Sequence, residues 1–457
     1  MGTVAVLVAA NVGLGAMLAS ARPEGVALAV LPVIVVAIGA LIASNRAILI
    51  FAAFALALFV PVTPTGALPG PGGISVYPSD LLVVLAVASW VAAWLTRPAY
   101  ARPSWPETQV LGWPLLLFGI PLVTAIVRGH ERYGEKLLSV PVRFLLYAGI
   151  AAAVTDLKPR DTYRWLVGLF YVGVVWQVLV ALYGYATGWT VDQQGAVSTG
   201  GERVLASSTA MFMAGALLLA LLNLEFDRSA RRTALHLVMA GLATFALAST
   251  LARTTFAVVG LLVPLLLLAF RHVRLGAAVF LPLCAPFLVL IALLVPTAAP
   301  SFFPTLAHRV TASPTTDTSA RWRSKAISAI WPQVREAPLT GVGFGRTASF
   351  EVNLRRTTFT QDPHNQFIYL WAGGGLLLLG SFVVLLIVYL GESWRRFKSS
   401  ATIERRFIFW AASLWFVLLV NSASGIILTD PASLLIFWIL MLLPTIVRDR
   451  EAGATAT

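Results

Sequence analysis

The chain has few charged residues and almost no cysteine. Asp, Glu, Lys and Arg make up 12% of its 457 residues, about half the share typical of soluble domains. The single cysteine, Cys284, excludes an intrachain disulfide and argues against a cysteine-based metal site. Hydrophobic residues, by contrast, make up 58% of the chain, more than the core of a soluble domain needs.

Several motifs that mark other activities are missing. The sequence has no Walker A loop, no HExxH motif and no Gly-x-Ser-x-Gly elbow. No DxD or ExD pair stands in the outer loops, where it would hold Mg²⁺ on a diphosphate, and no mid-span charges form a proton-relay pattern. These absences disfavour ATP-driven transport, metalloprotease activity and ion-coupled transport. The run Gly341-Val342-Gly343-Phe344-Gly345 follows no hydrophobic strand, so we expect a flexible glycine turn rather than a dinucleotide site.

What the chain has in abundance is long apolar runs. Runs of about 17–25 residues are the length of membrane-spanning helices. The pattern predicts an all-α, polytopic membrane bundle of about 12–14 transmembrane helices, and not a porin-type barrel, which would show alternating ten-residue strands. Residues 3–20 lack a basic start and a cleavage site, so we expect a retained helix there. The candidate spans are 3–20, 26–44, 47–62, 79–96, 111–127, 137–155, 165–185, 209–223, 234–250, 254–270, 275–296, 365–391, 407–427 and 432–447. The lower total applies if the first two form a re-entrant or peripheral hairpin.

Basic residues in the short loops predict the orientation. With both termini cytoplasmic, the inner loops hold 18 Lys and Arg and the short outer loops hold 6, which fits the positive-inside rule. The net charge of +13 is then explained by these loops and by anionic headgroups of membrane lipids, without nucleic acid. The long segment 297–364 would lie outside the membrane.

That segment divides the chain into three predicted parts. Residues 1–296 form the first part of the membrane bundle, 297–364 form an extracytoplasmic loop, and 365–457 form the last helices and a short cytoplasmic tail. A connection this long is rarely idle. Within it, apolar residues of Ala320 to Val334 recur at helical spacing, which predicts an amphipathic helix lying on the outer membrane surface.

Five arginines near the outer face are not explained by the positive-inside bias: Arg143, Arg203, Arg253, Arg321 and Arg323. An ionisable group in or near the hydrocarbon is costly, which makes each a functional candidate. The alternative for each is snorkelling to lipid headgroups. Several guanidinium groups at this depth suit a diphosphate, which they bind bidentately and whose charge they would stabilise as it departs, without a metal.

A histidine stands at the mouth of a predicted span. His364 is flanked by Asp362 and Asn365, directly before the run 365–391. An imidazole titrates near neutrality and can accept the proton of an acceptor hydroxyl. The alternative is a structural role in helix capping or interfacial hydrogen bonding. Of the other histidines, we expect His130 and His308 to be solvated loop residues, and His236 to lie on the inner side.

Taken together, these features resemble the bacterial O-antigen ligase superfamily, which includes O-antigen polymerases and protein O-oligosaccharyltransferases. The resemblance is carried by the Arg-rich surface helix, by Pro338-Leu339-Thr340-Gly341-Val342-Gly343-Phe344-Gly345, by His364-Asn365 with Tyr369, and by Gly373-Gly374-Gly375. Weaker matches lie at Arg203 and at Ser249 to Thr254. The first half of the chain matches in hydrophobic layout alone.

The resemblance implies a GT-C-like membrane glycosyltransferase that uses undecaprenyl diphosphate as the sugar carrier. It implies His364 as the base, Arg203 and Arg253 on the diphosphate with Arg143, Arg321 and Arg323 as weaker transfers, and Asn365 and Tyr369 in acceptor orientation. No metal, nucleotide or other cofactor would be required. Gly373 stands where the family often has an acid, which puts that acid's role in doubt.

The expected reaction is inverting transfer of a glycan to a hydroxyl of a glycan, lipid or protein at the outer face of a bacterial plasma membrane. Two alternatives stay open at this stage. One is a polymerase of the same superfamily, whose acceptor is itself a lipid-linked repeat. The other is a transporter or flippase for a lipid-linked or anionic solute, which would move its substrate without forming a bond.

Overall fold

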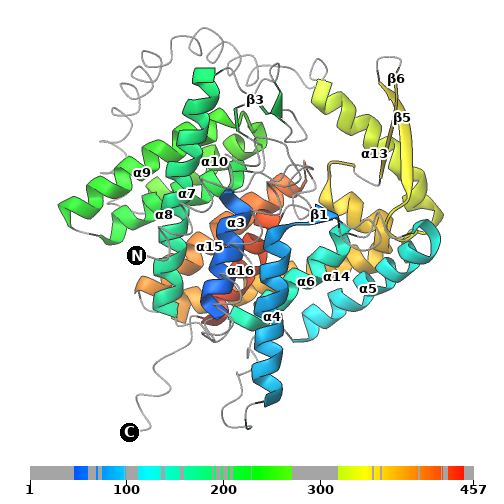
Figure 1. The fold of residues 1–457 in the computed structure, drawn as a ribbon, viewed down its shortest axis with the longest axis horizontal. Coiled ribbons are helices and arrows are strands. Elements are labelled where there is room, and N and C mark those ends of the chain that lie inside the picture. The colour runs from blue at the N-terminus through cyan, green and yellow to red at the C-terminus, as the bar shows by residue number, and fades with distance from the viewer. Residues whose placement is uncertain are drawn as a thin grey trace. The chain divides into compact units, whose positions relative to one another are not determined.

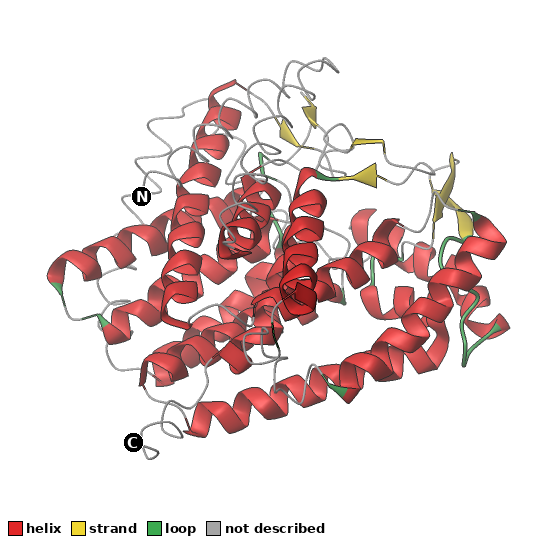
Figure 2. Cartoon of the chain, turned by 60° about the horizontal axis from the view of Figure 1, so that its bottom comes forward, coloured by secondary structure: helices red, strands yellow, loops and turns green. Residues whose placement is uncertain are grey.

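In the computed structural model, the described part of the chain forms twelve helices and three two-stranded antiparallel hairpins (Figures 1 and 2). The description covers residues 46–59, 68–69, 75–96, 98, 112–134, 139–154, 159–187, 190–191, 197–198, 204–205, 209–227, 229–269, 318–352, 355–360, 363–399, 402–423, 425 and 431–446. The predicted spans 3–20, 26–44 and 275–296 lie outside these residues.

Eleven of the helices overlap predicted spans, with ends that differ by up to eight residues. They are α3 (Arg46–Phe59), α4 (Pro78–Thr96), α5 (Trp113–Tyr133), α6 (Ser139–Val154), α7 (Pro159–Thr187), α8 (Thr209–Phe226), α9 (Ala230–Ser249), α10 (Arg253–Ala269), α14 (Gln366–Ser399), α15 (Thr402–Ser422) and α16 (Pro431–Ile446). The twelfth is α13 (Thr318–Glu336), the helix predicted within the long loop. The hairpins are β1 (Leu68–Pro69) with β2 (Ser75–Val76), β3 (Thr190–Val191) with β4 (Val197–Ser198), and β5 (Thr347–Val352) with β6 (Arg355–Thr360).

The helices are those of a multi-pass membrane protein. Among the described residues, five helices are long and apolar enough to cross a membrane, namely Pro78–Thr96, Trp113–Tyr133, Tyr163–Thr187, Ala230–Ser249 and Gln366–Lys398. In α5, Phe118 and Leu122 are buried, yet the exposed positions Leu116, Ile120 and Val123 are equally apolar. A helix that is apolar on its exposed face as well as its buried one is suited to lipid rather than water.

The chain folds into two compact units that interleave along the sequence. Unit 1 consists of residues 1–161, 317–408 and 422–457, and unit 2 of residues 162–316 and 409–421. In unit 1, an aromatic cluster joins Phe118, Phe144 and Phe382 to Phe437 and Trp438, with ring centroids 5.3–6.2 Å apart.

Unit 2 has its own aromatic centre on α7, α8 and α15. The rings of Phe170 and Phe212 stack with centroids 4.4 Å apart, and Trp410 meets Phe170 edge-on at 5.2 Å. The indole N–H of Trp410 donates to the carbonyl of Gly215 over 2.9 Å, so the buried ring keeps its polar contact. Such rings bury large areas and hold the helices of this unit at close spacing.

Helix α14 is broken near its start. Gly375 has a φ of 70° and a ψ of −170°, so the helix is interrupted between an N-terminal part and a longer C-terminal part. The residues that follow α13 fill the break. The N–H groups of Val342 and Gly343 donate to the carbonyls of Ala372 and Gly373, and those of Leu376 and Leu377 donate to Pro338 and Leu339, over 2.8–3.1 Å. The loop thus replaces hydrogen bonds that an unbroken helix would make.

The glycine run in this loop is packed, so the prediction of a flexible turn is wrong. Residues 341–345 are all buried in unit 1. Arg128 of α5 donates to the carbonyls of Thr340 and Gly341 over 2.8 and 2.7 Å, and the N–H of Phe344 reaches Ala125 over 3.3 Å. Glycine is needed in this loop because its backbone lies directly against the backbone of α14. A Cβ on Gly341 would lie 2.3 Å from the carbonyl oxygen of Gly373.

We therefore expect Gly341→Ala and Gly375→Ala to destabilise the protein strongly. Both glycines have positive φ, and a Cβ on Gly375 would lie 2.2 Å from the carbonyl oxygen of Leu339. Strain of this kind costs about 1–3 kcal/mol before the steric clash is added. Thermal unfolding in detergent measures the effect. Gly391→Ala, in open space on the same helix, is the matched control and should melt at or slightly above the wild-type temperature. Equal melting of all three variants would contradict the packed loop.

The helix α13 is confirmed, and part of its apolar face packs on protein, which was not predicted. Ile330 and Val334 are buried against Ala372 of α14, with Trp331, Ala348, Ile368 and Trp371 packed around them. The predicted membrane-facing stripe therefore joins α13 to α14 and β5 within unit 1.

The hairpin β5–β6 was not predicted. Thr347 pairs with Thr360 and Val352 with Arg355, which leaves a two-residue connection. Lys325 and Gln333 of α13 bind the carbonyls of Glu351 and Thr347 over 2.7 and 3.3 Å, so the hairpin is attached along α13. The β-branched Thr residues were the available signal.

Candidate functional site

His364 has an unusual backbone conformation. Its φ is 49°, and in the described part of the chain only one other non-glycine residue, Leu251, has a positive φ. For a residue other than glycine this conformation is uncommon, and it persists only where the surrounding structure holds it. The residue lies at the start of α14 and is partly exposed. A partly exposed histidine in a strained conformation is a candidate for chemistry.

Asn365 holds the chain on the helix side of His364. Its side-chain oxygen accepts hydrogen bonds from the N–H groups of Phe367 and Ile368 over 3.0 and 3.1 Å, which caps the first turn of α14. Its side-chain nitrogen donates to the carbonyl of Ala423 over 2.9 Å. These contacts give Asn365 a structural role, and its predicted part in orienting the acceptor stays a prediction.

An aromatic side chain packs against the imidazole of His364. The ring of Trp322, on α13, lies 4.4 Å from it between centroids, with an interplanar angle of 48°. Phe350 of β5 meets Trp322 at 5.4 Å and 73°. The rings of Trp322 on α13 and Phe350 on β5 thus gather beside His364, the predicted base.

Arg321 and Arg323 flank Trp322 on α13. Residues two apart on a helix do not share a face, and the two arginines differ accordingly: Arg321 is exposed and Arg323 is partly buried. Their side chains therefore start from different sides of α13, so a joint clamp on one phosphate is not implied. Their diphosphate role stays a prediction.

The surroundings of Gly373 explain the departure from the family pattern. A Cβ at this position would lie 2.3 Å from the ring of Phe344. Phe344 also packs on Tyr369, with centroids 5.0 Å apart, and Tyr369 is buried. An acidic side chain at 373 has no room in this chain. The predicted role of Tyr369 toward the acceptor is not tested by this packing.

Arg143 lies in a second polar centre of unit 1. Its side chain is 6% exposed and its Nε is 3.1 Å from the carboxylate of Asp80 on α4. Asp80 also accepts from the hydroxyl of Tyr147 over 2.7 Å and from the N–H of Tyr77 over 2.9 Å, and the ring of Tyr77 lies 4.7 Å from the guanidinium carbon. This pairing, which was not predicted, gives Arg143 a structural partner. Its diphosphate role stays a prediction.

A double-mutant cycle on this pair would separate the two roles. Removing one partner of a buried ion pair leaves an uncompensated charge and costs about 3–5 kcal/mol. We expect Asp80→Asn and Arg143→Gln each to lower stability by that order, and the double variant to lose clearly less than the sum. The thermal unfolding of the four proteins measures the coupling. Additive losses would show that Arg143 does not depend on Asp80.

Arg203 and Arg253, which are also assigned to the diphosphate, belong to unit 2. Arg253 is the first residue of α10 and follows the tight turn at Thr250 and Leu251, where Leu251 has a φ of 51°. Arg203 lies outside the described residues. The turn places the Arg253 backbone at a helix N-terminus, where N–H groups and the helix dipole favour anions.

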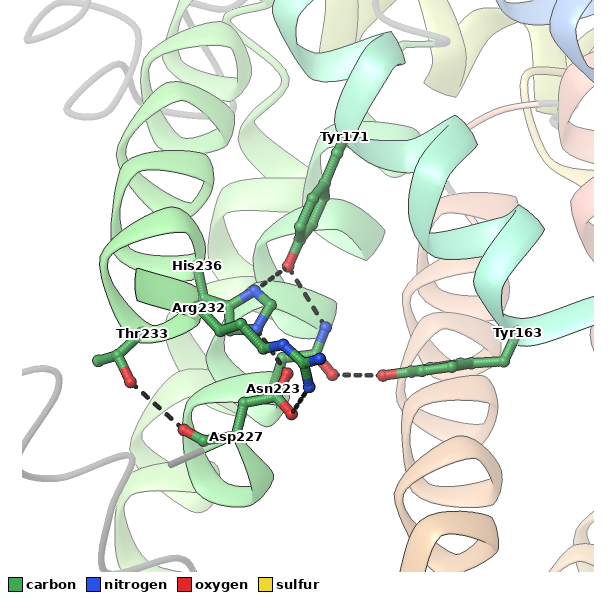
Figure 3. A network of polar contacts seen from close by, with 7 residues as sticks. All are labelled: Tyr163, Tyr171, Asn223, Asp227, Arg232, Thr233 and His236. Atoms are coloured by element: carbon green, nitrogen blue, oxygen red, sulfur yellow. Dashed lines mark hydrogen bonds and ion pairs between the residues drawn. The ribbon is translucent and has the colours of Figure 1, made fainter. Parts of the chain in front are cut away.

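His236, the buried histidine among the described residues, is fully engaged in unit 2 (Figure 3). Its Nε2 lies 2.8 Å from Asp227 and its Nδ1 lies 2.7 Å from the hydroxyl of Tyr171. Asn223 donates to that hydroxyl over 3.3 Å and accepts from Tyr163. One direction of donation, from Tyr163 to Asp227, satisfies every member. Because both ring nitrogens are occupied, this network connects α7, α8 and α9 and is a poor place for a base.

Comparison with known families supplies the decisive observation. Residues 237–383 match the family model described as O-antigen ligase. This match supports membership of the O-antigen ligase superfamily. A search of curated proteins found no match. The family match supports a membrane glycosyltransferase of the O-antigen ligase and polymerase type.

The O-antigen ligase match covers most of the predicted site. Arg253, Arg321, Arg323, His364 and Asn365 fall within residues 237–383, as does Tyr369. It also contains the glycine loop and the break in α14. Arg143 and Arg203 precede it. The segment that holds His364 against α13 is therefore the segment that carries the family pattern.

Proposed function

We propose that this O-antigen ligase family protein transfers a glycan from undecaprenyl diphosphate to an acceptor hydroxyl. The observation that carries the proposal is the setting of His364. It is partly exposed, held in a strained conformation, capped by Asn365 and packed on Trp322, within the segment that matches the family. Residues in strained backbone conformations cluster at functional sites of proteins.

In the proposed reaction, the imidazole of His364 accepts the proton of the acceptor hydroxyl. The hydroxyl oxygen attacks the anomeric carbon of the first sugar as the bond from that carbon to the diphosphate oxygen breaks, so the anomeric configuration inverts. Undecaprenyl diphosphate leaves with the additional negative charge. The proton ends on His364 and passes to solvent. No metal or nucleotide takes part in this proposal.

Arginines would stabilise the departing diphosphate. A guanidinium is always charged and donates two parallel hydrogen bonds to phosphate oxygens. Arg253 is the strongest candidate, because the N-terminus of α10 adds its own N–H groups and dipole to the arginine charge. Arg203 belongs to the same proposal, and Arg321 and Arg323 are weaker members.

The proposed site faces the outer side of a bacterial plasma membrane. The excess of basic residues in the opposite loops supports this orientation. A lipid-linked donor would keep its polyprenyl tail among the membrane lipids while its diphosphate and glycan reach His364. The acceptor would approach from the outside.

The test is to look for bond formation with purified protein. Lipid-linked glycan extracted from cells that lack the gene would be incubated with the protein and with an envelope extract of the same cells. We expect free undecaprenyl diphosphate and a glycan-extended acceptor, both detected by mass spectrometry. A product ladder of long, lipid-linked chains would assign the polymerase alternative. Unchanged donor in the presence of folded protein would contradict the proposal.

A further inference from the structure

We infer that Trp322 is a positioning residue that fixes the imidazole of His364 in its productive orientation. The inference rests on the proposed function of His364 as base. It starts from a contact between separate elements: the indole of α13 and the imidazole before α14 have centroids 4.4 Å apart and planes tilted by 48°. At that separation the rings are in van der Waals contact, so neither turns freely.

Trp322 is itself held firmly. Phe350 packs against it edge-on at 5.4 Å, and β5, which carries Phe350, is attached to α13 through the contact of Lys325 with Glu351. Further along α13, Ile330 and Val334 are buried against α14. The indole therefore keeps its place relative to the start of α14, as a support for the imidazole must.

The C-terminal end of α13 is fixed to α14, the helix that follows His364. The indole of Trp371 on α14 donates to the carbonyl of Pro338 over 3.0 Å, just after α13 ends. The glycine loop then enters the break in α14. Both ring-bearing elements thus belong to one packed assembly of α13, β5 and α14, so the distance between Trp322 and His364 is set by the fold of unit 1.

A base at this position needs such support. The torsion that turns a histidine ring is broad and weakly restricted, and turning it moves both ring nitrogens. Proton transfer requires a ring nitrogen within about 2.6–3.2 Å of the acceptor oxygen, and a misplacement of about 1 Å can cost 10²-fold in rate. Asn365 fixes the backbone beside His364, but not the ring. Trp322 contacts the ring itself.

The inference predicts a loss of kcat with little change in binding. Trp322→Leu removes the aromatic face, and we expect kcat to fall about 10- to 100-fold. The KM for extracted lipid-linked glycan, and the Kd for undecaprenyl diphosphate used as a binding probe, should stay within about twofold, since Trp322 acts through His364. Trp322→Phe keeps a flat aromatic face and should restore most of kcat. The measured quantity is the rate at which undecaprenyl diphosphate is released.

Trp331→Leu is the matched control. Trp331 is on the same helix and packs on Trp371 with centroids 5.5 Å apart, so its loss removes similar area away from His364. We expect it to lower the melting temperature and to leave kcat within about threefold. The inference is overturned if Trp322→Leu keeps the wild-type kcat, if it raises KM alone as a sugar-stacking residue would, or if Trp322→Phe loses as much kcat as Trp322→Leu.

His364→Ala, assayed beside these variants, separates this inference from the proposed function. If His364→Ala loses transfer and Trp322→Leu does not, His364 is the base and Trp322 does not position it. If His364→Ala keeps transfer, the proposed function and the inference both fail. If Trp322→Leu does not fold, Trp322→Phe is compared with the wild type instead. A loss of kcat beyond tenfold in Trp322→Phe, at an unchanged melting temperature, would then overturn the inference.

Discussion

Replacing His364 with alanine is expected to lower glycan transfer by about 10²–10⁴-fold, the contribution of a positioned general base. In the proposed reaction no other group takes the proton as the acceptor oxygen attacks. Donor binding should be nearly unchanged, because the proposal assigns it to the arginines and the lipid tail. The measurement is the rate of undecaprenyl diphosphate release by purified protein, together with the Kd for undecaprenyl diphosphate.

His130→Ala provides the control for this prediction. His130 is exposed on α5 and has no role in the proposed reaction, so its variant should keep the wild-type rate. Parallel losses of binding and rate in His364→Ala would show that the residue supports the structure of the site, and the base would have to be sought elsewhere.

Replacing Arg253 with alanine is expected to weaken both binding and catalysis. A charge-assisted hydrogen bond to phosphate contributes about 1.5–3 kcal/mol, so the Kd for undecaprenyl diphosphate should rise tenfold or more. The charge that develops on the leaving diphosphate is also left unstabilised, and kcat/KM should fall about 10²–10³-fold. Binding of undecaprenyl diphosphate and initial rates with extracted donor give the two quantities.

Two further variants sharpen the result for Arg253. Arg253→Lys keeps the charge but loses the bidentate geometry, so it should recover only part of the activity. Arg231→Ala removes an exposed arginine from the predicted inner side and should change neither quantity. Donor affinity and rate that stay at the wild-type level in Arg253→Ala would remove this residue from the diphosphate site.

The membrane helices were predictable from the sequence because their signal is local. Each described span contains an apolar run that is visible in the sequence by itself. The observed bounds of α4, α8 and α16 lie within about three residues of the prediction, as is usual for such patterns. The helix α13 was found by its apolar periodicity for the same reason. The elements that pack on α13 could not be predicted in this way. An apolar face shows that some element covers it, but does not show which one.

The parts that sequence reasoning missed depend on contacts between distant residues. Gly341 and Gly375 are required because the loop after α13 and the break in α14 lie backbone against backbone. No residue near either glycine in the sequence indicates this contact. Asp80 and Arg143 each stand near the start of a predicted span. Only the packing of α4 on α6 turns them into a pair. In the same way, His364 could be predicted as a candidate from its place before a span. Its contact with Trp322 became visible only in the folded structure.

The most direct test of the account is mass spectrometry of undecaprenyl-diphosphate-linked glycans in cells. Three strains are compared, carrying the wild-type gene, a deletion, or His364→Ala expressed at the wild-type level. We expect one lipid-linked glycan to accumulate equally in the deletion and His364→Ala strains, and its mass identifies the donor. Accumulation in the deletion strain with none in the His364→Ala strain would contradict the central claim that His364 is the catalytic base.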